Sequence, residues 1–517
     1  MRHLTGGAAA LAAALSLLGT GTAFAAANNN NSQKLRAAVT LEGVRAHQAA
    51  FQSIADMSGG NRFAGLQGHD LSAQYVMARL RDAGYQPTTF EFVYDAFFER
   101  SPSTLDQISP TPTAYVNGND FRIMSYSGSG AVTAPLAQPT GNRNGCDPAD
   151  FAGFAAGSIA LVERGVCTFR IKTTNAAAAG ASAILIYNNI PGVVNGTLGE
   201  AGGLSAIPSL GLTQALGQSL RTQTASGPVV MRVRTDTGAQ PLSTYNVLAE
   251  TAGGNDENVV MVGAHLDSVT AGPGINDNGS GSAAILETAI QMSKVKPTNK
   301  VRFAWWSAEE SGLIGATRYV QSLSPAEGNR IALYLNFDMV GSPNFARFVY
   351  DGDDSTGTGT IPAGCIERCK EGSGVIESVF NGYFSEVAGL TTEPTPFNGR
   401  SDYGPFIGAN IPSGGLFTGA EGIKTPAQEV KFGGVAGVAY DPCYHAACDT
   451  FANNSDEGLD QMSDAIAHAT ITFAQNTSIV NGVKGKGNFK SPKTAADGED
   501  GTGGGGGLHD EHEHDEE

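Results

Sequence analysis

Short apolar runs that alternate with helical stretches and end in His, Asp or Glu constrain the fold of this chain more than any other feature. The pattern begins after Tyr245 and predicts strands at 258–263, 301–306, 331–337, 348–351 and 415–418, with helices at 281–295, 312–322, 375–387 and 457–474. Strands that alternate with helices in this way predict an α/β fold with a mostly parallel central sheet and helices on both faces. In such sheets, functional sites gather at the carboxyl ends of the strands.

A segment of different composition interrupts this pattern. Residues 42–92 are helical in character and end in a strand-like stretch, whereas residues 106–240 carry short β-branched runs separated by glycines. We therefore expect a β-rich domain inserted into the α/β domain. The expected organisation is a signal peptide at 1–25, the first part of the α/β domain at 33–105, the β-rich domain at 106–240, the main part of the α/β domain at 241–480, and a disordered tail rich in Gly, His and acids at 481–517.

The N-terminus has the features of a secretory signal. Arg2 precedes an apolar run at 8–18, and Ala23, Phe24 and Ala25 form a small-x-small cleavage site. The apolar run is too short for a membrane helix, and no later stretch reaches the ~18 consecutive apolar residues that such a helix requires. A buried core helix is the alternative interpretation of this run. We expect a secreted protein that is cleaved near Ala25 and has no membrane anchor.

The six cysteines fall into three groups that are local in sequence. These are Cys146 with Cys167, Cys365 with Cys369, and Cys443 with Cys448. An even number of cysteines in an exported chain indicates disulfides, and proximity favours these three pairs, although six cysteines allow 15 connectivities. A zinc site at Cys365 and Cys369 is the rival interpretation, but no second Cys or His pair accompanies it at the usual spacing.

The chain is acidic, which narrows the classes of partner. It has 32 Lys and Arg against 50 Asp and Glu, and a formal net charge of −18. Nine of the acids lie between Asp497 and Glu517, where there is no Lys or Arg, so this last segment alone carries half of the net charge. Such a chain lacks the electrostatic footprint that nucleic acids and anionic membranes recognise, and both partners are disfavoured.

Residues able to bind a metal ion follow three successive predicted strands. They are His265 and Asp267 after 259–264, Glu309 and Glu310 after 301–306, and Asp338 after 331–337. His265 and Asp267 are two positions apart, so on an extended backbone they point the same way. Asp277 follows within a glycine-rich loop, whose glycines let the backbone approach a bound group closely.

The number and type of these residues match a two-metal hydrolytic site. Zinc binds imidazole nitrogen and carboxylate oxygen, and two zinc ions need about four to five such ligands together with an open position for water. A late histidine would complete the set, and His445 is the best candidate because a disulfide between Cys443 and Cys448 would hold its loop. Each residue taken singly is more often structural, and only the combination is specific.

At these residues the chain resembles the secreted dizinc aminopeptidases of the bacterial leucyl aminopeptidase and fungal aminopeptidase Y type. The matching stretches are Gly263-Ala-His-Leu-Asp-Ser-Val269, Gly274-Ile-Asn-Asp-Asn-Gly-Ser-Gly281, Ser307-Ala-Glu-Glu-Ser-Gly-Leu313, Asn336-Phe-Asp-Met339, Gly399-Arg-Ser-Asp-Tyr403 and Asp441-Pro-Cys-Tyr-His445. Residues 157–217 resemble the protease-associated (PA) domain that many members carry as an insertion. The resemblance covers roughly residues 40–475.

The resemblance implies a role for each matching residue. It implies that His265 and Asp338 bind one zinc ion, that Glu310 and His445 bind the other, and that Asp277 bridges the two. It further implies that Asp267 orients the ring of His265, that Glu309 is the general base and acid, and that Tyr444 stabilises the oxyanion. For substrate binding it implies Arg400, with Met339 and Phe417 lining the pocket for the N-terminal side chain.

The expected substrates are peptides or proteins with a free N-terminus, with Leu or another apolar residue first. One alternative is a dizinc carboxypeptidase of the glutamate-releasing type. Such an enzyme would need a cluster of basic residues to bind the substrate carboxylates, and residues 397–403 contain only one, Arg400. Another is a non-catalytic binding protein on the same fold. A structural calcium ion near Asp456 and Asp460 is a further expectation.

Overall fold

The computed structural model describes residues 29–357 and 364–481. The expected signal peptide at 1–25 and nearly all of the expected tail lie outside these residues. The main body contains α1 (Ser32–Ala38), α2 (Leu41–Met57), α3 (Gln67–Asp82), β9 (Asn255–His265), α6 (Gly279–Met292), β10 (Asn299–Trp306), α7 (Ile314–Ser322), α8 (Pro325–Gly328), β11 (Ile331–Phe337), β12 (Phe348–Tyr350), α9 (Glu367–Gly382), η2 (Tyr383–Ala388), β13 (Glu393–Thr395), α10 (Tyr403–Gly408), β14 (Ser413–Phe417), α11 (Pro426–Phe432), α12 (Asp456–Gln475) and α13 (Ser478–Asn481).

The centre of the main body is a mostly parallel sheet, as the alternating pattern predicts. Strands β14, β11, β9 and β10 lie side by side and run parallel. In the register of these strands His265 lies opposite Trp306, and Gly263 lies opposite Asn336. The carboxyl ends of β9, β10 and β11 therefore meet at one edge of the sheet.

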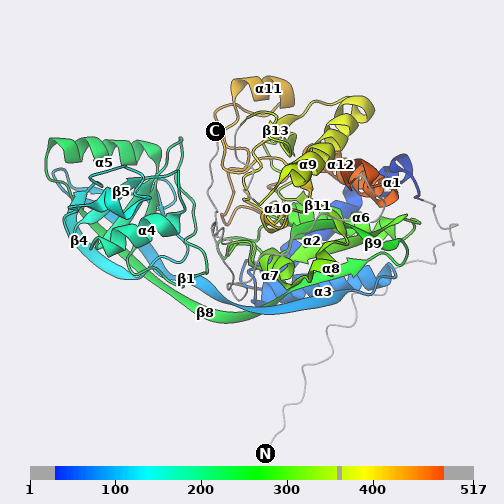
Figure 1. Ribbon diagram of the computed structural model, residues 1–517, viewed down its shortest axis with the longest axis horizontal. Helices are drawn as coiled ribbons and strands as arrows, with labels where there is room; N and C mark the ends of the chain where they lie inside the picture. The colour runs from blue at the N-terminus through cyan, green and yellow to red at the C-terminus, as the bar shows by residue number, and fades with distance from the viewer. Residues whose placement is uncertain (1–28, 358–363, 482–517) are drawn as a thin grey trace, which may run out of the picture.

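Helices cover both faces of this sheet (Figure 1). The buried residues of the strands alternate between two cores, one on each face. Val260 and Val262 of β9 pack in a core with α2, α6 and α12, whereas Val259 and Met261 pack in a second core with α7 and α10. Every second residue of a strand points to the same face, so a strand buried on both sides reads as a continuous apolar run. The predicted α/β fold is confirmed.

Two long strands connect the main body to a smaller lobe (Figure 1). They are β1 (Thr88–Ser109) and β8 (Val230–Glu250), which pair antiparallel from Thr88 opposite Leu248 to Ser109 opposite Val230. Within the main body β8 also pairs with β10, and within the lobe it pairs with β4 (Gly130–Ala137). This ribbon passes through the positions 105/106 and 240/241, where the composition of the sequence changes.

The smaller lobe combines a sheet with two helices. It contains β2 (Thr113–Ala114), β3 (Phe121–Ile123), η1 (Pro148–Phe151), β5 (Ile159–Glu163), α4 (Phe169–Ala178), β6 (Ala183–Tyr187), β7 (Ser209–Leu212) and α5 (Gln214–Ser226). Residues of β5 and β6 alternate between two apolar clusters, one on each face of this sheet. The lobe therefore has a core of its own.

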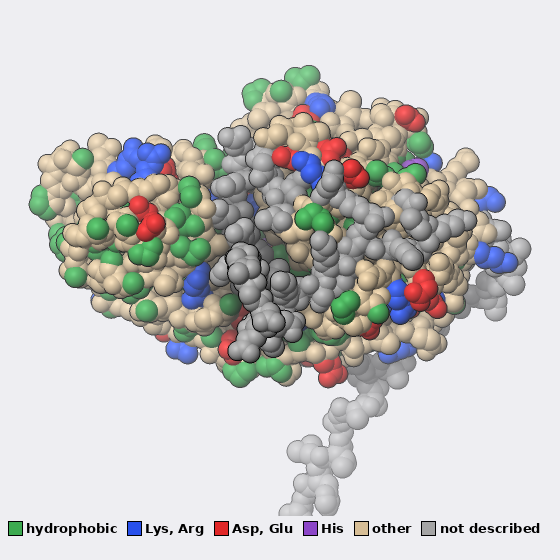
Figure 2. All heavy atoms as spheres, viewed as in Figure 1, with side chains coloured by type: hydrophobic (Ala, Val, Ile, Leu, Met, Phe, Trp, Pro, Cys, Tyr) green, Lys and Arg blue, Asp and Glu red, His purple; other side chains and the backbone are tan. Residues whose placement is uncertain are grey.

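The three predicted disulfides are confirmed. Cys146 bonds to Cys167, Cys365 to Cys369, and Cys443 to Cys448. None of the described helices has both the length and the apolar character needed to cross a membrane. On the face drawn in Figure 2, basic and acidic side chains lie near one another on both lobes, so this face carries no single sign of charge.

Candidate metal centre

The ends of three neighbouring strands bring the candidate ligands together. His265 is the last residue of β9, Asp338 follows β11 directly, and Glu309 and Glu310 follow β10 after a short turn. Asp277 precedes α6, a helix that begins after Asn278, whose side chain accepts a hydrogen bond from the Gly281 N–H. The parallel register of the strands therefore places the carboxylates around one point.

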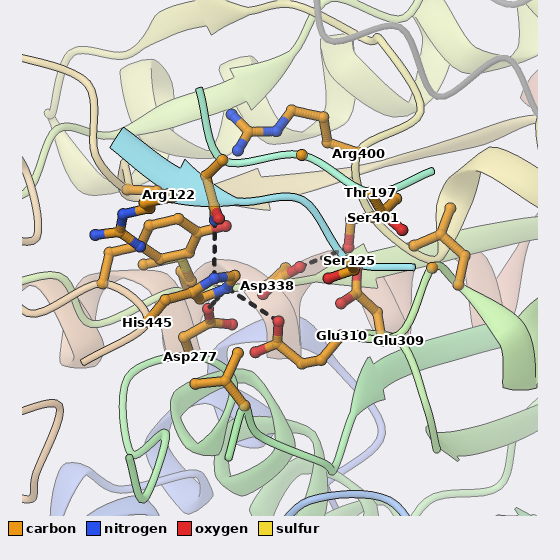
Figure 3. A pocket seen from close by; sticks show the side chains of 18 of the residues that line it. Arg122, Ser125, Thr197, Asp277, Glu309, Glu310, Asp338, Arg400, Ser401 and His445 are labelled. Carbon is orange, nitrogen blue, oxygen red and sulfur yellow. Dashed lines mark hydrogen bonds and ion pairs between the residues drawn. The ribbon is translucent and has the colours of Figure 1, made fainter. Parts of the chain in front are cut away.

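Asp277 lies between two groups of side chains, each suited to one metal ion. Its Oδ1 is 3.3 Å from Nε2 of His265, and its Oδ2 is 3.1 Å from Nε2 of His445. We call His265, Asp277 and Asp338 the inner group, and Asp277, Glu310 and His445 the outer group; within each, one ligand atom per residue lies within 4.8 Å of the others. Figure 3 shows Asp277 and Glu310 converging on His445.

The histidines of the two groups differ in exposure. The side chain of His265 is 1% exposed and that of His445 is 17% exposed. His445 Nε2 lies 2.9 Å from Glu310 Oε2, and His265 Nε2 lies 3.3 Å from Asp338 Oδ1. His265 is thus in the protein interior, whereas His445 lies at the cavity wall together with the three carboxylates Asp277, Glu310 and Asp338.

Two buried carboxylate oxygens in this centre lack a hydrogen-bond donor. They are Oε1 of Glu310 and Oδ1 of Asp338, for which the described residues supply no hydrogen-bond partner. A buried carboxylate oxygen without a donor is costly unless a cation binds it. Five N and O ligands in two overlapping groups match what zinc accepts, so the residues fit a pair of such ions.

Backbone strain gathers at the same place. Ala308, Met339 and His445 are non-glycine residues with φ of 58°, 47° and 54°. The left-handed region is unfavourable for residues with a Cβ and tends to persist at functional sites. Ala308 and Met339 adjoin Glu309 and Asp338, so two of the strained positions lie directly beside carboxylates of the centre.

Comparison with known proteins agrees with this geometry. Residues 246–470 match the model of peptidase family M28, and residues 132–220 match the PA domain. The chain is 45% identical over 444 residues to an aminopeptidase of Pseudomonas aeruginosa, a match that covers 83% of this chain and 80% of that one. The chain belongs to peptidase family M28.

Further similarity extends over most of the chain. Leucine aminopeptidase 2 of Trichophyton rubrum is 41% identical over 442 residues, which is 85% of each chain. The solved structure of an aminopeptidase from Aneurinibacillus sp. strain AM-1 has a TM-score of 0.66 at 28% identity and covers 85% of this chain and 95% of its own. The chain is accordingly an aminopeptidase of the M28 zinc peptidase family with a PA domain in its smaller lobe.

Several expected site residues of this M28 peptidase line one cavity of about 500 Å³. They are Asp277, Glu309, Glu310, Asp338, Met339, Arg400, Phe417, Tyr444 and His445. The ring of Tyr444 stacks on that of His445, with centroids 3.9 Å apart, and Arg400 donates from Nη2 to Glu421 Oε1 at 2.9 Å. His265 and Asp267 lie behind the cavity wall, in the protein interior.

Asp267 contacts the end of β9 and the turn that follows β10. Its main-chain oxygen lies 3.2 Å from Nδ1 of His265, whereas its nearer carboxylate oxygen is 3.7 Å from that nitrogen. The carboxylate accepts hydrogen bonds from the main-chain N–H groups of Glu309 and Glu310, at 3.2 and 3.3 Å. Asp267 thereby holds the turn of Glu309 and Glu310 against β9.

Other residues support the centre through contacts that the sequence does not indicate, although Ser401 stands in the matching stretch Gly399-Arg-Ser-Asp-Tyr403. Ser401 donates to Asp338 Oδ2 at 2.6 Å, and the Asp449 carboxylate accepts from the main-chain N–H of Asp277 at 2.9 Å. The fully buried Arg62 donates to the main-chain oxygens of Leu266, Pro273 and Gly274.

One supporting contact comes from the smaller lobe. Asn195, from the PA domain, lies 3.0 Å from Nδ1 of His445. Each partner is distant along the chain, so no local pattern predicts these contacts.

The centre shifts the pKa of its titratable groups. Burial raises the pKa of Glu310 to about 7, and the charge of Asp277 adds to this. Burial also raises the pKa of Glu309 well above its usual range, against the opposing charge of His265. Burial lowers the pKa of His445, but Glu310 and Asp277 together outweigh it and raise this pKa to about 10. A bound cation reverses this balance, because it favours ionised carboxylates and neutral imidazole.

The acids near the start of α12 do not form such a centre. Asp456 pairs with Arg45, at 3.2 Å between Oδ1 and Nε. Within the described part of the chain, neither Asp456 nor Asp460 belongs to a group of three metal-ligating side chains. The calcium expectation for these two residues gains no support from the geometry.

Proposed function

We propose that this M28 peptidase removes the N-terminal residue from peptides by means of two zinc ions, one in each ligand group. The observation that carries the proposal is the position of Asp277, whose two carboxylate oxygens face histidines from the two groups. Five ligands with one shared carboxylate match the number that a two-metal hydrolytic site requires. His265 and Asp338 would bind one ion, Glu310 and His445 the other, and Asp277 both.

The protein groups then divide the chemistry between them. Bound zinc ions would lower the pKa of a water molecule and polarise the scissile carbonyl. Glu309 lines the cavity, and its Oε2 lies 3.9 Å from His265 Nε2, so its carboxylate is near the inner group without belonging to either group. It accepts the proton of the attacking water and passes it to the leaving amine.

Tyr444 supplies a donor on the other side of the cavity. Burial raises the pKa of its hydroxyl well above the usual range, so the hydroxyl keeps its proton at neutral pH. A protonated phenol can donate a hydrogen bond to the oxyanion of the tetrahedral intermediate. Asp267 contributes by holding the Glu309 turn in place.

The cavity supports an apolar first residue in the substrate. Met339, Phe417 and Tyr350 line it, and the rings of Phe417 and Tyr350 are stacked with centroids 6.4 Å apart. Glu309 and Asp338 are the carboxylates available for the free α-amine. Arg400 is held by Glu421, which fits positioning of the peptide chain. We propose Leu and similar apolar residues as the preferred N-terminal residues of the substrate.

We also propose that the protein is secreted, because its three disulfides suit an oxidising compartment.

The test compares hydrolysis of leucine p-nitroanilide with that of its N-acetylated form. We expect cleavage of the free amine alone, loss of activity on chelation, and recovery with about two zinc ions per chain. Glu309→Gln should retain both zinc ions and lose at least about a hundredfold in kcat, because the general base is removed while the ligands remain.

Two outcomes would overturn the proposal. Release of C-terminal glutamate from a blocked peptide, without cleavage of leucine p-nitroanilide, would establish the carboxypeptidase alternative. Saturation by a single zinc ion at full activity would contradict the two-ion arrangement.

A further inference from the structure

The PA domain reaches into the metal centre through one side chain. Asn195 lies in the loop between β6 and β7 and approaches the ring of His445, its amide nitrogen position 3.0 Å from Nδ1. These residues are 250 positions apart in the chain and belong to different lobes. Arg122, Ser125 and Thr197 of the smaller lobe also line the cavity (Figure 3).

The orientation of His445 depends on what contacts its Nδ1. Its Nε2 faces Asp277 and Glu310, so Nε2 is the nitrogen available to a metal ion. An imidazole that binds a metal through Nε2 carries its proton on Nδ1 and needs an acceptor there. An asparagine amide can turn by 180° and present its oxygen in place of its nitrogen. Asn195 can therefore accept a hydrogen bond from the Nδ1–H group and fix both the tautomer and the angle of the ring.

The loop that carries Asn195 is held in place on both sides. Within the smaller lobe, the main-chain oxygen of Ser125 accepts the Leu198 N–H at 2.9 Å, and the Ser125 N–H donates to the Gly196 oxygen at 3.1 Å. Toward the main body, Glu200 pairs with Arg318 of α7 at 3.1 Å and accepts the Asp95 N–H at 2.9 Å. A Cβ on Gly196 would stand 2.6 Å from the Phe169 ring, so the loop packs closely enough to need glycine.

The inner group obtains the same support from its own domain. The acceptor next to Nδ1 of His265 is the main-chain oxygen of Asp267, 3.2 Å away, at the end of the same strand. In the outer group, none of the described residues of the main body is hydrogen-bonded to Nδ1 of His445. The PA domain thus supplies the contact at Nδ1 of His445 that the end of β9 supplies at Nδ1 of His265.

We infer that Asn195 is a positioning residue for His445, and that the PA domain thereby sets the zinc affinity of the outer group. The inference rests on the proposed role of His445 as a zinc ligand. It makes the PA domain a component of the catalytic centre, because a displacement of that domain would release His445. Asn195 acts through the ring of His445 and not on the substrate.

The experiment measures stepwise zinc binding to the full chain by competition with a fluorescent chelator. We expect Asn195→Ala to weaken one of the two binding steps about tenfold to a hundredfold, the usual effect of removing such a partner, and to leave the other step unchanged. Asn195→Asp keeps an acceptor toward Nδ1 and should restore most of the lost affinity. The matched control is Asn189→Ala, an exposed residue of the same domain that does not line the cavity.

A second readout separates positioning from substrate contact. With saturating zinc, Asn195→Ala should recover most of its kcat with KM for leucine p-nitroanilide close to the wild-type value. A raised KM with both zinc steps unchanged would overturn the inference and make Asn195 a substrate contact. Two unchanged zinc steps and unchanged kinetics, in a variant that melts like the wild type, would overturn it as well.

The variant His445→Ala distinguishes failure of this inference from failure of the proposed function. If His445→Ala removes one zinc ion and Asn195→Ala affects neither, only the role of Asn195 is wrong. If His445→Ala itself leaves both zinc steps unchanged, then the proposed ligand set is wrong and the inference falls with it.

Discussion

The inner and outer ligand groups share Asp277 but are built in different ways. His265 and Asp338 of the inner group come from adjacent strand ends, and the strands behind them are buried on both faces. His445 of the outer group lies on a loop that the Cys443–Cys448 disulfide closes, and a residue of the other lobe contacts its ring. The sheet therefore positions the first half of the centre, whereas loops and the PA domain position the second.

This difference predicts unequal tolerance to change. Strand ends in a packed sheet are fixed by many apolar contacts, so a single lost hydrogen bond there alters little besides its own partner. A loop has fewer such contacts and depends more on each specific interaction. The outer group should accordingly depend more strongly on each single contact, and the following variants test this.

The largest effect is expected for Asp277→Asn, because Asp277 is the only residue in both groups. Asparagine is nearly isosteric but neutral, so both zinc ions should bind more weakly and kcat/KM should fall by about a thousandfold or more. Zinc content after gel filtration and the hydrolysis of leucine p-nitroanilide measure these losses. Asp460→Asn on the exposed face of α12 is the matched control. Loss of only one ion would mean that Asp277 does not bridge.

A smaller effect, confined to the inner group, is expected for Ser401→Ala. Ser401 donates to Asp338 Oδ2 at 2.6 Å and accepts from Asn336 Nδ2 at 2.8 Å. Removing this hydroxyl should weaken zinc binding to the inner group about tenfold. The measurement is best made in the His445→Ala background, where the inner group alone retains its ligands. If Ser401→Ala and Asn195→Ala lower the affinity for the same zinc ion, then the inner and outer groups do not have independent supporting contacts.

Opening the loop of His445 should affect the outer group only. Replacing Cys443 and Cys448 by serine removes a cross-link that stabilises the fold by about 2 kcal/mol in the loop-entropy model. We expect the outer zinc step to weaken less than tenfold, since Asp277 and Glu310 remain. Replacing Cys146 and Cys167 by serine should destabilise the PA domain by about 3 kcal/mol. An equal loss of zinc affinity in both double variants would show that the disulfide near His445 has no local role.

The smallest effect on the centre is expected for His468→Gln, in α12 and outside both groups. Burial lowers the pKa of His468 to about 4, and the charge of Arg36 adds to this. In the unfolded chain His468 binds a proton near pH 6.5, whereas in the folded protein it does so only near pH 4. His468 therefore lowers the free energy of unfolding as the pH falls from about 6.5 to 4. His468→Gln should flatten the dependence of the melting temperature on pH in this range. Both zinc steps should stay as in the wild type.

Much of the main body was predictable from the sequence because its signals are local. The apolar runs at 301–306 and 331–337 correspond to β10 and β11, and the disulfide pairs follow from proximity. The length of the β1 and β8 ribbon was not predictable, since exposed residues interrupt its apolar pattern. Such strands are stabilised by pairing with each other, which no single segment encodes in its own periodicity.

The sequence by itself determined which side chains of metal-ligating type follow the strands of this M28 peptidase, because residue type and the order of strands and helices are properties of the chain. Only the tertiary structure decided that Asp277 faces two histidines, that Ser401 supports Asp338 and that Asn195 reaches His445. These contacts join residues far apart in the chain, and their geometry depends on how the sheet twists and how the two lobes pack. A hydrogen bond depends on tenths of an ångström, and the packing of the whole molecule sets that distance.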